Sequence, residues 1–167
     1  MNIWKLSMGT NEIGDDYYRN LIKNNRVTVH PQTSAKAQSS KTQGENFIEA
    51  RSGDLFFVCR SNNFIELIGM FKDNVLLEPL GEEYKNNGWK DRSFVTIYSA
   101  AENRDKYNKN FTDSNGIKPW WHPGDNSTFI EVKDLNLFEK EILQPVFNKG
   151  LQELEGEIVS AILIELS

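Results

Sequence analysis

The fold of this chain is decided by a stretch that reads Gly53-Asp54-Leu55-Phe56-Phe57-Val58-Cys59, then a polar turn, then Phe64-Ile65-Glu66-Leu67-Ile68-Gly69-Met70. Both apolar runs are rich in aromatic and β-branched residues, which favour strands. Ser61-Asn62-Asn63 between them is short and polar. The sequence therefore predicts a β-hairpin whose turn lies at these three residues.

Further strands and two helices are expected on either side of this hairpin. A helix is expected to be capped by Asp15 or Asp16 and to end at Asn24-Asn25. Apolar residues from Phe138 to Leu154 recur near helical spacing, with a bend at Pro145. Short apolar or β-branched runs predict strands at residues 3–8, 26–29, 75–77, 94–98 and 128–132.

Three stretches are predicted to lie outside this framework. Residues 32–44 contain no large apolar side chain, so we expect a mobile loop there. Residues 84–92 are polar and turn-like, and residues 158–164 are apolar enough for a last strand or a segment between domains. The whole pattern predicts an α+β fold, residues 1–167 forming a single domain built on a small β-barrel flanked by helices.

Length and composition restrict the class of protein. The chain has 167 residues, of which 38% are apolar and 26% charged, as in a soluble single domain. Its longest apolar run, residues 55–59, is far too short to cross a bilayer, and the N-terminus does not resemble a secretion signal. One cysteine and two histidines argue against a disulfide framework or a zinc site. We expect a cytoplasmic protein with no membrane partner, metal or cofactor.

The charge is unevenly distributed. The net charge is −5, and residues 131–167 alone carry that excess, with eight acids against three bases. Between Tyr17 and Gly44 there is no acid, while Arg19, Lys23, Arg26, Lys36 and Lys41 are all basic. Affinity for phosphate depends on the local field of one face, so the overall acidity is compatible with a nucleic-acid partner. A solvated basic loop is the alternative.

The sequence offers little support for catalysis. It has no glycine-rich phosphate loop and no serine in a nucleophile-elbow context. Cys59 ends an apolar strand and is expected to be a buried, inert thiol. The carboxylate pairs Glu82-Glu83 and Glu139/Glu141 are expected on solvated faces. We therefore do not expect an enzyme.

Aromatic residues stand out because they lie in polar, turn-like sequence. Tyr84 and Trp89 lie among lysine, arginine and asparagine, and Trp120-Trp121 lie between two prolines. Adjacent residues rarely both point into one core, so at least one of the paired tryptophans should face a groove. Flat aromatic surfaces beside cations suit stacking on nucleobases, each stack contributing about 1–3 kcal/mol. The alternative is that these tryptophans close one end of a barrel.

The order of these motifs resembles the PUA-like superfamily, in particular the EVE and YTH domains. Ile3 to Ser7 is similar to the opening strand, whose final serine lines the YTH pocket, and residues 23–28 are similar to the family's first helix-to-strand junction. The hairpin at residues 53–70 matches the shared hairpin. Residues 88–95 resemble the YTH segment whose tryptophan, here Trp89, walls a methyl-binding cage, with Tyr84 where a second cage aromatic is common. The cage tryptophan of the second strand is replaced by Val27, beside the hydroxyl of Thr28.

A later segment is similar to another group of proteins. Residues 120–124, 129–131 and 143–147 look closer to the N-terminal domains of McrB-like GTPases of modification-dependent restriction systems. This resemblance implies a targeting module that belongs to a longer protein or assists a GTPase or nuclease in another chain.

The resemblance implies a reader that turns a methylated adenine or cytosine out of DNA, with RNA as the alternative nucleic acid, into an aromatic pocket. The implied base-binding residues are Ser7, Met8, Thr28, Tyr84, Trp89, Trp120 and Trp121. The implied phosphate-binding residues are Arg19, Lys23, Arg26, Lys90, Arg92 and Lys118. Two alternatives stay open. One is a protein-interaction domain with buried tryptophans and an acidic docking helix. The other is a PUA/ASCH-like enzyme acting on RNA or nucleotides, with Glu66, Glu82 and Lys90 as candidate residues.

Overall fold

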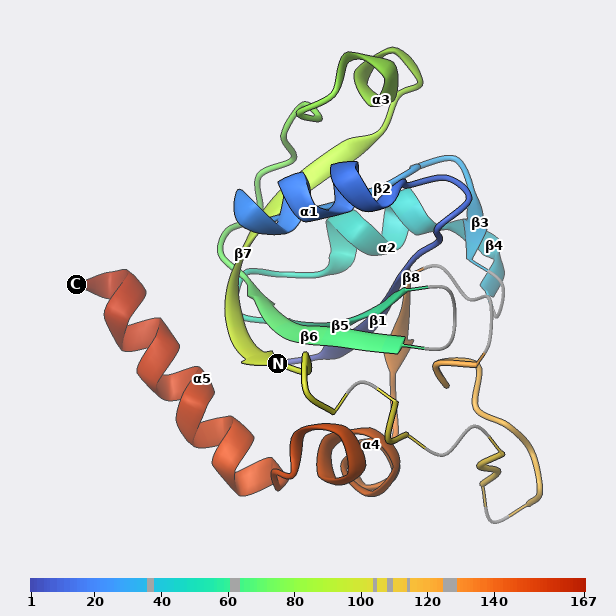
Figure 1. Cartoon of the computed structure of the whole chain (residues 1–167), viewed down its shortest axis with the longest axis vertical. Helices are drawn as coiled ribbons and strands as arrows, with labels where there is room; N and C mark the ends of the chain where they lie inside the picture. The colour runs from blue at the N-terminus through green and yellow to red at the C-terminus, as the bar shows by residue number, and fades with distance from the viewer. Residues whose placement is uncertain (36–37, 61–63, 104, 108–109, 114, 125–128) are drawn as a thin grey trace.

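A six-stranded sheet, curled into a half-barrel, forms the centre of the computed structural model (Figure 1). Its strands are β1 (Ile3–Met8), β2 (Arg26–Val29), β5 (Leu55–Arg60), β6 (Phe64–Phe71), β7 (Lys90–Ser99) and β8 (Phe129–Val132). They are arranged in the order β2-β7-β6-β5-β1-β8, with β1 and β5 parallel and all other neighbours antiparallel. The structure describes residues 1–35, 38–60, 64–103, 105–107, 110–113, 115–124 and 129–167.

Helices cover both faces of this sheet (Figure 1). They are α1 (Asp15–Lys23), α2 (Gln43–Glu49), α3 (Glu82–Asn86), α4 (Leu135–Phe138), the π-helical stretch η1 (Glu139–Phe147) and α5 (Leu151–Leu166). Leu21 of α1 and Phe47 of α2 join one buried cluster, and Ile142 of η1 and Leu154 of α5 join the other. The predicted α+β class is therefore confirmed.

The hairpin that decides the fold forms as predicted. β5 pairs with β6 so that Leu55 lies opposite Met70 and Arg60 opposite Phe64, while the predicted turn at residues 61–63 lies outside the described residues. Alternate side chains of β5 enter opposite clusters, Phe56 toward α1 and α2 and Phe57 toward η1 and α5. Burial on both faces explains why this strand is apolar without interruption.

The region predicted as a mobile loop contains regular structure, which corrects that expectation. Residues 32–44 include β3 (Ser34–Ala35) and β4 (Gln38–Thr42), which pair antiparallel, and the first turn of α2. The hydroxyl of Thr42 accepts a hydrogen bond from the Glu45 amide and so caps α2. The amides of Gln43 and Gly44 donate to the carbonyls of Thr33 and Pro31. Backbone hydrogen bonds thus order a segment that lacks large apolar side chains.

Residues 84–92 are also more regular than predicted. α3 occupies their first part, and β7 begins at Lys90 rather than near Phe94. This extension pairs with β2, Val29 lying opposite Lys90 and Arg26 opposite Ser93. The predicted strand at residues 75–77 is reduced to a single bridge between Leu77 and Asp91.

The C-terminal part of the chain is helical throughout its apolar stretch. Residues 158–164, predicted as a strand or an interdomain segment, belong to α5, because Leu154, Ile158 and Ala161 recur at helical spacing against the core. The helix expected from Phe138 to Leu154 is divided in two. Pro145 lies inside η1, and the chain turns at Asn148, which has a positive φ of 54°.

Candidate functional site

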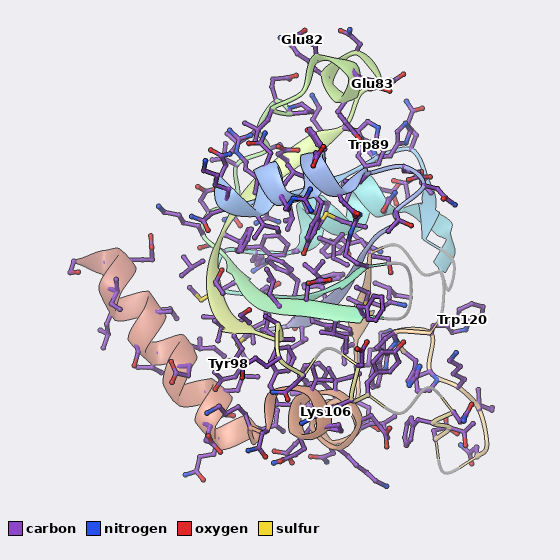
Figure 2. All side chains as sticks on the ribbon, in the orientation of Figure 1. Glu82, Glu83, Trp89, Tyr98, Lys106 and Trp120 are labelled. Carbon is purple, nitrogen blue, oxygen red and sulfur yellow. The ribbon has the colours of Figure 1, made fainter. Side chains whose placement is uncertain are left out.

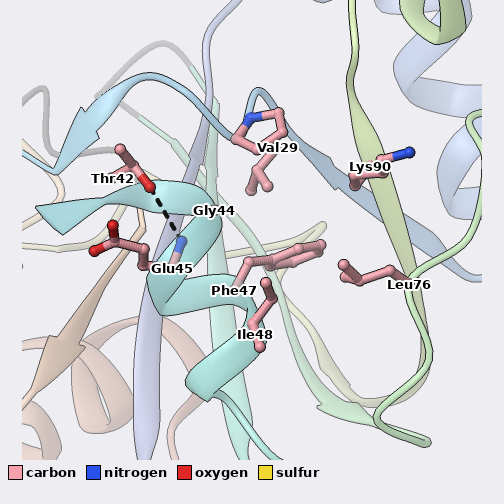
Figure 3. A pocket seen from close by; sticks show the side chains of 9 residues that line it. Val29, Thr42, Gly44, Glu45, Phe47, Ile48, Leu76 and Lys90 are labelled. Atoms are coloured by element: carbon pink, nitrogen blue, oxygen red, sulfur yellow. Dashed lines mark hydrogen bonds between the residues drawn. The ribbon is translucent and has the colours of Figure 1, made fainter.

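An apolar hollow of about 210 Å³ lies between α2, the end of β2 and the start of β7. Figure 3 shows Phe47 and Ile48 of α2 on one side of it and Leu76 and Lys90 on the other. The complete lining is Val29, Pro31, Thr42, Gly44, Glu45, Phe47, Ile48, Leu76 and Lys90. We call this feature the α2–β7 hollow.

The walls of the α2–β7 hollow run from the core to the surface. Val29 and Phe47 are buried, whereas Ile48 is 67% and Leu76 38% exposed. Gly44 is required beside Pro31, because a Cβ at Gly44 would lie 2.6 Å from the Pro31 Cβ. This close approach holds α2 against the end of β2. The result is a permanent apolar recess that opens to solvent.

Polar groups lie at the edge of the hollow. The Thr42 hydroxyl oxygen accepts a hydrogen bond from the Glu45 amide at 3.2 Å, and the Lys90 ammonium donates one to a Glu78 carboxylate oxygen at 3.0 Å. In Figure 3 the Lys90 nitrogen points away from the hollow, so only the apolar stem of this side chain faces it. An apolar group could therefore enter without displacing a charge.

Four aromatic rings contact one another in a row, and two of them belong to residues next in sequence to lining residues of the hollow. Tyr17 stacks on Tyr84 with ring centres 3.9 Å apart, Tyr84 meets Trp89 edge-on at 5.4 Å, and Trp89 meets His30 edge-on at 5.5 Å. His30 lies between two lining residues in the sequence, and Trp89 directly precedes Lys90. Partial burial raises the pKa of both tyrosines, so their hydroxyls stay neutral and can donate hydrogen bonds.

The structure brings two of the expected base-binding residues, Tyr84 and Trp89, into contact, but neither lines the α2–β7 hollow. Thr28 lies close by in sequence, but its side chain is buried and donates to the Lys90 carbonyl. Met8 is buried in the cluster under α1, and Ser7 points to the opposite side of β1. Neither Ser7 nor Met8 lines the hollow.

The paired tryptophans lie elsewhere. Trp121 is only 7% exposed and packs edge-on against Phe138, in the cluster on the other side of the sheet from Trp89. Trp120 is 54% exposed, and Figure 2 places it far from Trp89. The two neighbours thus point differently, as expected, but they do not complete one pocket with Trp89.

The expected phosphate-binding residues fall into three groups. Arg19 and Lys23 are exposed on α1, Arg19 beside Asp16, and Lys118 is half-buried. Arg26 pairs with Asp91 at 3.2 Å and Lys90 with Glu78 at 3.0 Å. Of the other basic residues between Tyr17 and Gly44, Lys36 lies outside the described residues.

Arg92 requires a correction, because it is buried and its guanidinium donates to three backbone carbonyls. These belong to Phe47, Ala50 and Asp73. The guanidinium also lies 4.1 Å from the centre of the Phe71 ring. Arg92 therefore ties α2 to the loop after β6 and cannot reach a phosphate in this structure.

Residues considered for catalysis do not gather in the α2–β7 hollow. Lys90 lines it, whereas Glu82 lies on α3 and Glu66 on β6. Cys59 is buried as predicted, and burial raises the pKa of its thiol to about 12. Buried Asp91 has its pKa raised by burial, with the adjacent Arg26 opposing this shift.

Sequence reasoning missed most of the lining residues of the hollow. The sequence did not predict α2, because the helix begins inside the predicted loop at residues 32–44 and continues past it. Four lining residues were therefore not expected at a site, namely Pro31, Phe47, Ile48 and Leu76. The only available signal was the pair Phe47-Ile48 that follows the polar residues. Within the described part of the chain, no three His, Cys, Asp or Glu side chains are grouped as metal ligands, and no helix is long and apolar enough to cross a membrane.

Comparison with known proteins gives no family. No family model matches the chain, and no curated protein matches it. The solved structures with some similarity include the NMR structure of Rpa0253 from Rhodopseudomonas palustris, with 13% sequence identity and a TM-score of 0.34. The match covers 57% of this chain and 61% of that one. A likeness this low carries no argument about fold or function.

Proposed function

We propose that this chain is a nucleic-acid-binding module that recognises a modified base in DNA by taking the extruded base into the α2–β7 hollow. The observation that carries this proposal is the apolar recess itself, open to solvent and lined by Lys90, the residue that follows Trp89 in the sequence. Drug-sized ligands occupy pockets of about 300–1,000 Å³, so a hollow of about 210 Å³ suits a single ring system.

The free-energy cost of extruding a base is comparable to the free energy that stacking and burial in the hollow would contribute. Turning a base out of a duplex costs a few kcal/mol. Stacking on one aromatic side chain returns about 1–3 kcal/mol, and burying a methyl group adds about 0.8 kcal/mol. Trp89, which is partly exposed and precedes the lining residue Lys90 in the sequence, is the ring proposed for such a stack. Burying the methyl group contributes little free energy, so discrimination between modified and unmodified bases would depend on a close fit of the modified base against Leu76 and Ile48.

The EVE/YTH-like assignment and a targeting role in a modification-dependent restriction system belong to the same proposal. The order of motifs in the sequence supports them, together with a curled sheet flanked by helices. Lys23, which is exposed on α1, would hold a phosphate directly, and Arg19 would do so after leaving Asp16, with Lys118 as a further phosphate contact. Arg26 and Lys90 would contribute after exchanging their carboxylate partners for phosphate, and the chain itself would not be catalytic.

The test is a fluorescence-anisotropy titration at one modest salt concentration. It compares matched duplexes containing adenine, N6-methyladenine, cytosine, 5-methylcytosine or 5-hydroxymethylcytosine, with one methylated RNA. We expect at least tenfold preference for one modified duplex, which corresponds to about 1.4 kcal/mol. Equal, salt-sensitive binding to every duplex would leave only a phosphate-binding surface and would contradict the proposal.

Two neighbouring residues provide a matched pair of variants. Leu76 lines the hollow, whereas Val75 is exposed and does not. Leu76→Gln should remove most of the preference for the modified duplex, because it places an amide in the apolar recess. Val75→Gln should preserve the preference. Trp89→Ala should weaken binding to the preferred duplex, and unchanged binding would exclude Trp89 from the site.

A further inference from the structure

Two ion pairs involve consecutive residues at the start of β7, and their carboxylates differ in exposure. Asp91 accepts a hydrogen bond from the Arg26 guanidinium at 3.2 Å. Glu78 accepts one from the Lys90 ammonium at 3.0 Å. The Asp91 side chain is completely buried, whereas the Glu78 side chain is 60% exposed. Loss of its cation would therefore leave Glu78 in water, but would leave Asp91 as an isolated charge inside the protein.

Neutral or acidic groups surround the rest of the Asp91 carboxylate. Thr28 lies opposite Asp91 on β2, and its hydroxyl donates to the Lys90 carbonyl. Tyr17 of α1 lies close enough to feel the charges of Asp91 and Arg26, and no described residue donates a hydrogen bond to Asp91 Oδ1. Burial raises the pKa of Asp91, and the Thr28 hydroxyl and Arg26 oppose this shift. The charged form of this carboxylate thus depends on Arg26.

Arg26 is placed where it can serve either Asp91 or a phosphate. One of its terminal nitrogens donates both to Asp91 Oδ2 and to the Glu78 carbonyl, the latter at 3.0 Å, yet the side chain is still 21% exposed. It belongs to the basic stretch between Tyr17 and Gly44 that contains no acid. Guanidinium groups bind carboxylate and phosphate with the same geometry, so a phosphate at this position competes directly with Asp91.

We propose that Asp91 is a positioning residue for the binding of DNA phosphate: it holds Arg26 in the free protein and takes up one proton from solvent when Arg26 turns to a phosphate. Because the phosphate is that of bound DNA, this role rests on the proposed function. A buried carboxylate without a partner is costly, so protonation of Asp91 accompanies the exchange. Lys90 can make the same exchange without a proton, because water then solvates Glu78. DNA binding should therefore strengthen as the pH falls, by at most about tenfold per pH unit for one proton.

The test is the affinity for a modified duplex and its unmodified counterpart, measured by fluorescence anisotropy at constant salt from mildly acidic to mildly alkaline pH. With wild type, the affinity for both duplexes should fall as the pH rises. Asp91→Asn imitates the protonated carboxyl, so it should bind more tightly at the alkaline end and lose most of the pH dependence. Glu78→Gln is the matched control and should shift the affinity equally at every pH. Circular dichroism of both variants shows whether the fold is preserved.

Stability provides a second measurement that needs no DNA. Arg26→Met leaves Asp91 buried without its cation, so the midpoint of urea unfolding should lie below that of wild type at neutral pH. This gap should narrow as the pH is lowered, because stability that depends on the protonated carboxyl is lost as the pH rises from the unfolded pKa of about 3.9 through the higher folded value. Lys90→Met, whose partner Glu78 is exposed, should show a gap that does not change with pH.

The outcomes separate this role of Asp91 from the proposed function. A preference for the modified duplex with an affinity that does not change with pH would overturn the role of Asp91 alone. So would a pH dependence that Asp91→Asn retains, as one arising from a histidine would, or a stability gap of Arg26→Met that is constant with pH. A pH-dependent affinity that is equal for both duplexes would instead contradict base recognition alone. Absence of binding to either duplex would overturn both.

Discussion

At the scale of single residues, Arg92 has the most demanding environment in the molecule. Burying a guanidinium is costly unless its donors are paired, and three carbonyls from two separate segments accept from its two terminal nitrogens, while Nε is buried without a partner among the described residues. Burial lowers the pKa of this group, although it remains charged at neutral pH. Its function is thus to connect α2 with the loop after β6, close to the α2–β7 hollow.

Replacing Arg92 should therefore affect stability before it affects binding. We expect Arg92→Met to lower the free energy of unfolding by about 3–5 kcal/mol, because three buried carbonyls lose their charged donor. Urea denaturation measures this change. Arg19→Met, at an exposed position, should change the same quantity by less than about 0.5 kcal/mol. Equal effects of the two substitutions would show that Arg92 is not a structural anchor.

Glu141 provides a pH-dependent test at the same scale. Its carboxyl is buried on η1, no described residue donates a hydrogen bond to Oε2, and burial raises its pKa. Stability from the protonated form is present below the unfolded pKa of about 4.3 and is lost as the pH rises through the higher folded value. Glu141→Gln should therefore gain stability relative to wild type between acidic and neutral pH. Urea unfolding at both pH values tests this, and the exposed Glu155→Gln should show no such trend.

At the scale of elements, the sequence was sufficient where burial is strong. The β5–β6 hairpin, β1, β2 and α1 follow the predicted bounds closely, because apolar runs and turn residues coincide there. Residues 38–49 were not predictable in the same way. Their order depends on the Thr42 cap and on backbone hydrogen bonds to Pro31 and Thr33, and polar composition does not report these interactions.

The same limit applies to the candidate site. Trp89 and Tyr84 were singled out from sequence because aromatic residues in polar surroundings are conspicuous, and the structure brings them into contact without placing either in the lining of the hollow. Ile48 and Leu76 were missed, because exposed aliphatic residues are common in proteins. Only the fold shows that these two residues line the same hollow. Arg92 and Trp121 were expected to bind phosphate and base, but both side chains are buried. The polar residues around them in the sequence do not reveal this burial.

Two glycines in different elements should respond oppositely to alanine. A Cβ at Gly69 of β6 would lie 2.5 Å from the Phe56 ring and 2.9 Å from the Phe94 ring. Gly69→Ala should therefore lower the free energy of unfolding by about 1–3 kcal/mol. Gly156 of α5 has no described atom within 4 Å of such a Cβ, so Gly156→Ala should raise stability by up to about 1 kcal/mol. Thermal denaturation compares them, and a stable Gly69→Ala variant would mean that the two rings can separate.

At the scale of the whole molecule, the excess acids of the C-terminal part and the acid-free basic stretch between Tyr17 and Gly44 occupy different elements. The exposed bases Arg19 and Lys23 lie on α1, whereas the acids Glu153, Glu155 and Glu157 lie on α5, which packs on the other side of the sheet. A net charge of −5 therefore leaves one face free to approach a polyanion.

This separation predicts a defined salt dependence of DNA binding. Lys23→Gln should reduce the slope of log affinity against log salt concentration by about 1, because one phosphate contact is lost. The same substitution should weaken binding to all duplexes equally. Lys149→Gln, which removes a base paired with Glu153 on α5, should leave the slope unchanged. Titrations at several salt concentrations measure both. Equal slopes for the two variants would remove α1 from the interface.

Entry of an extruded base into the α2–β7 hollow can be followed by fluorescence. The most direct measurement is the emission of 2-aminopurine stacked beside the modified base, recorded as protein is added. Extrusion removes a stacking neighbour, so we expect a saturable rise in emission with wild type and Val75→Gln, and a much smaller rise with Leu76→Gln. Saturated binding without a change in emission, or the same rise with Leu76→Gln, would contradict it.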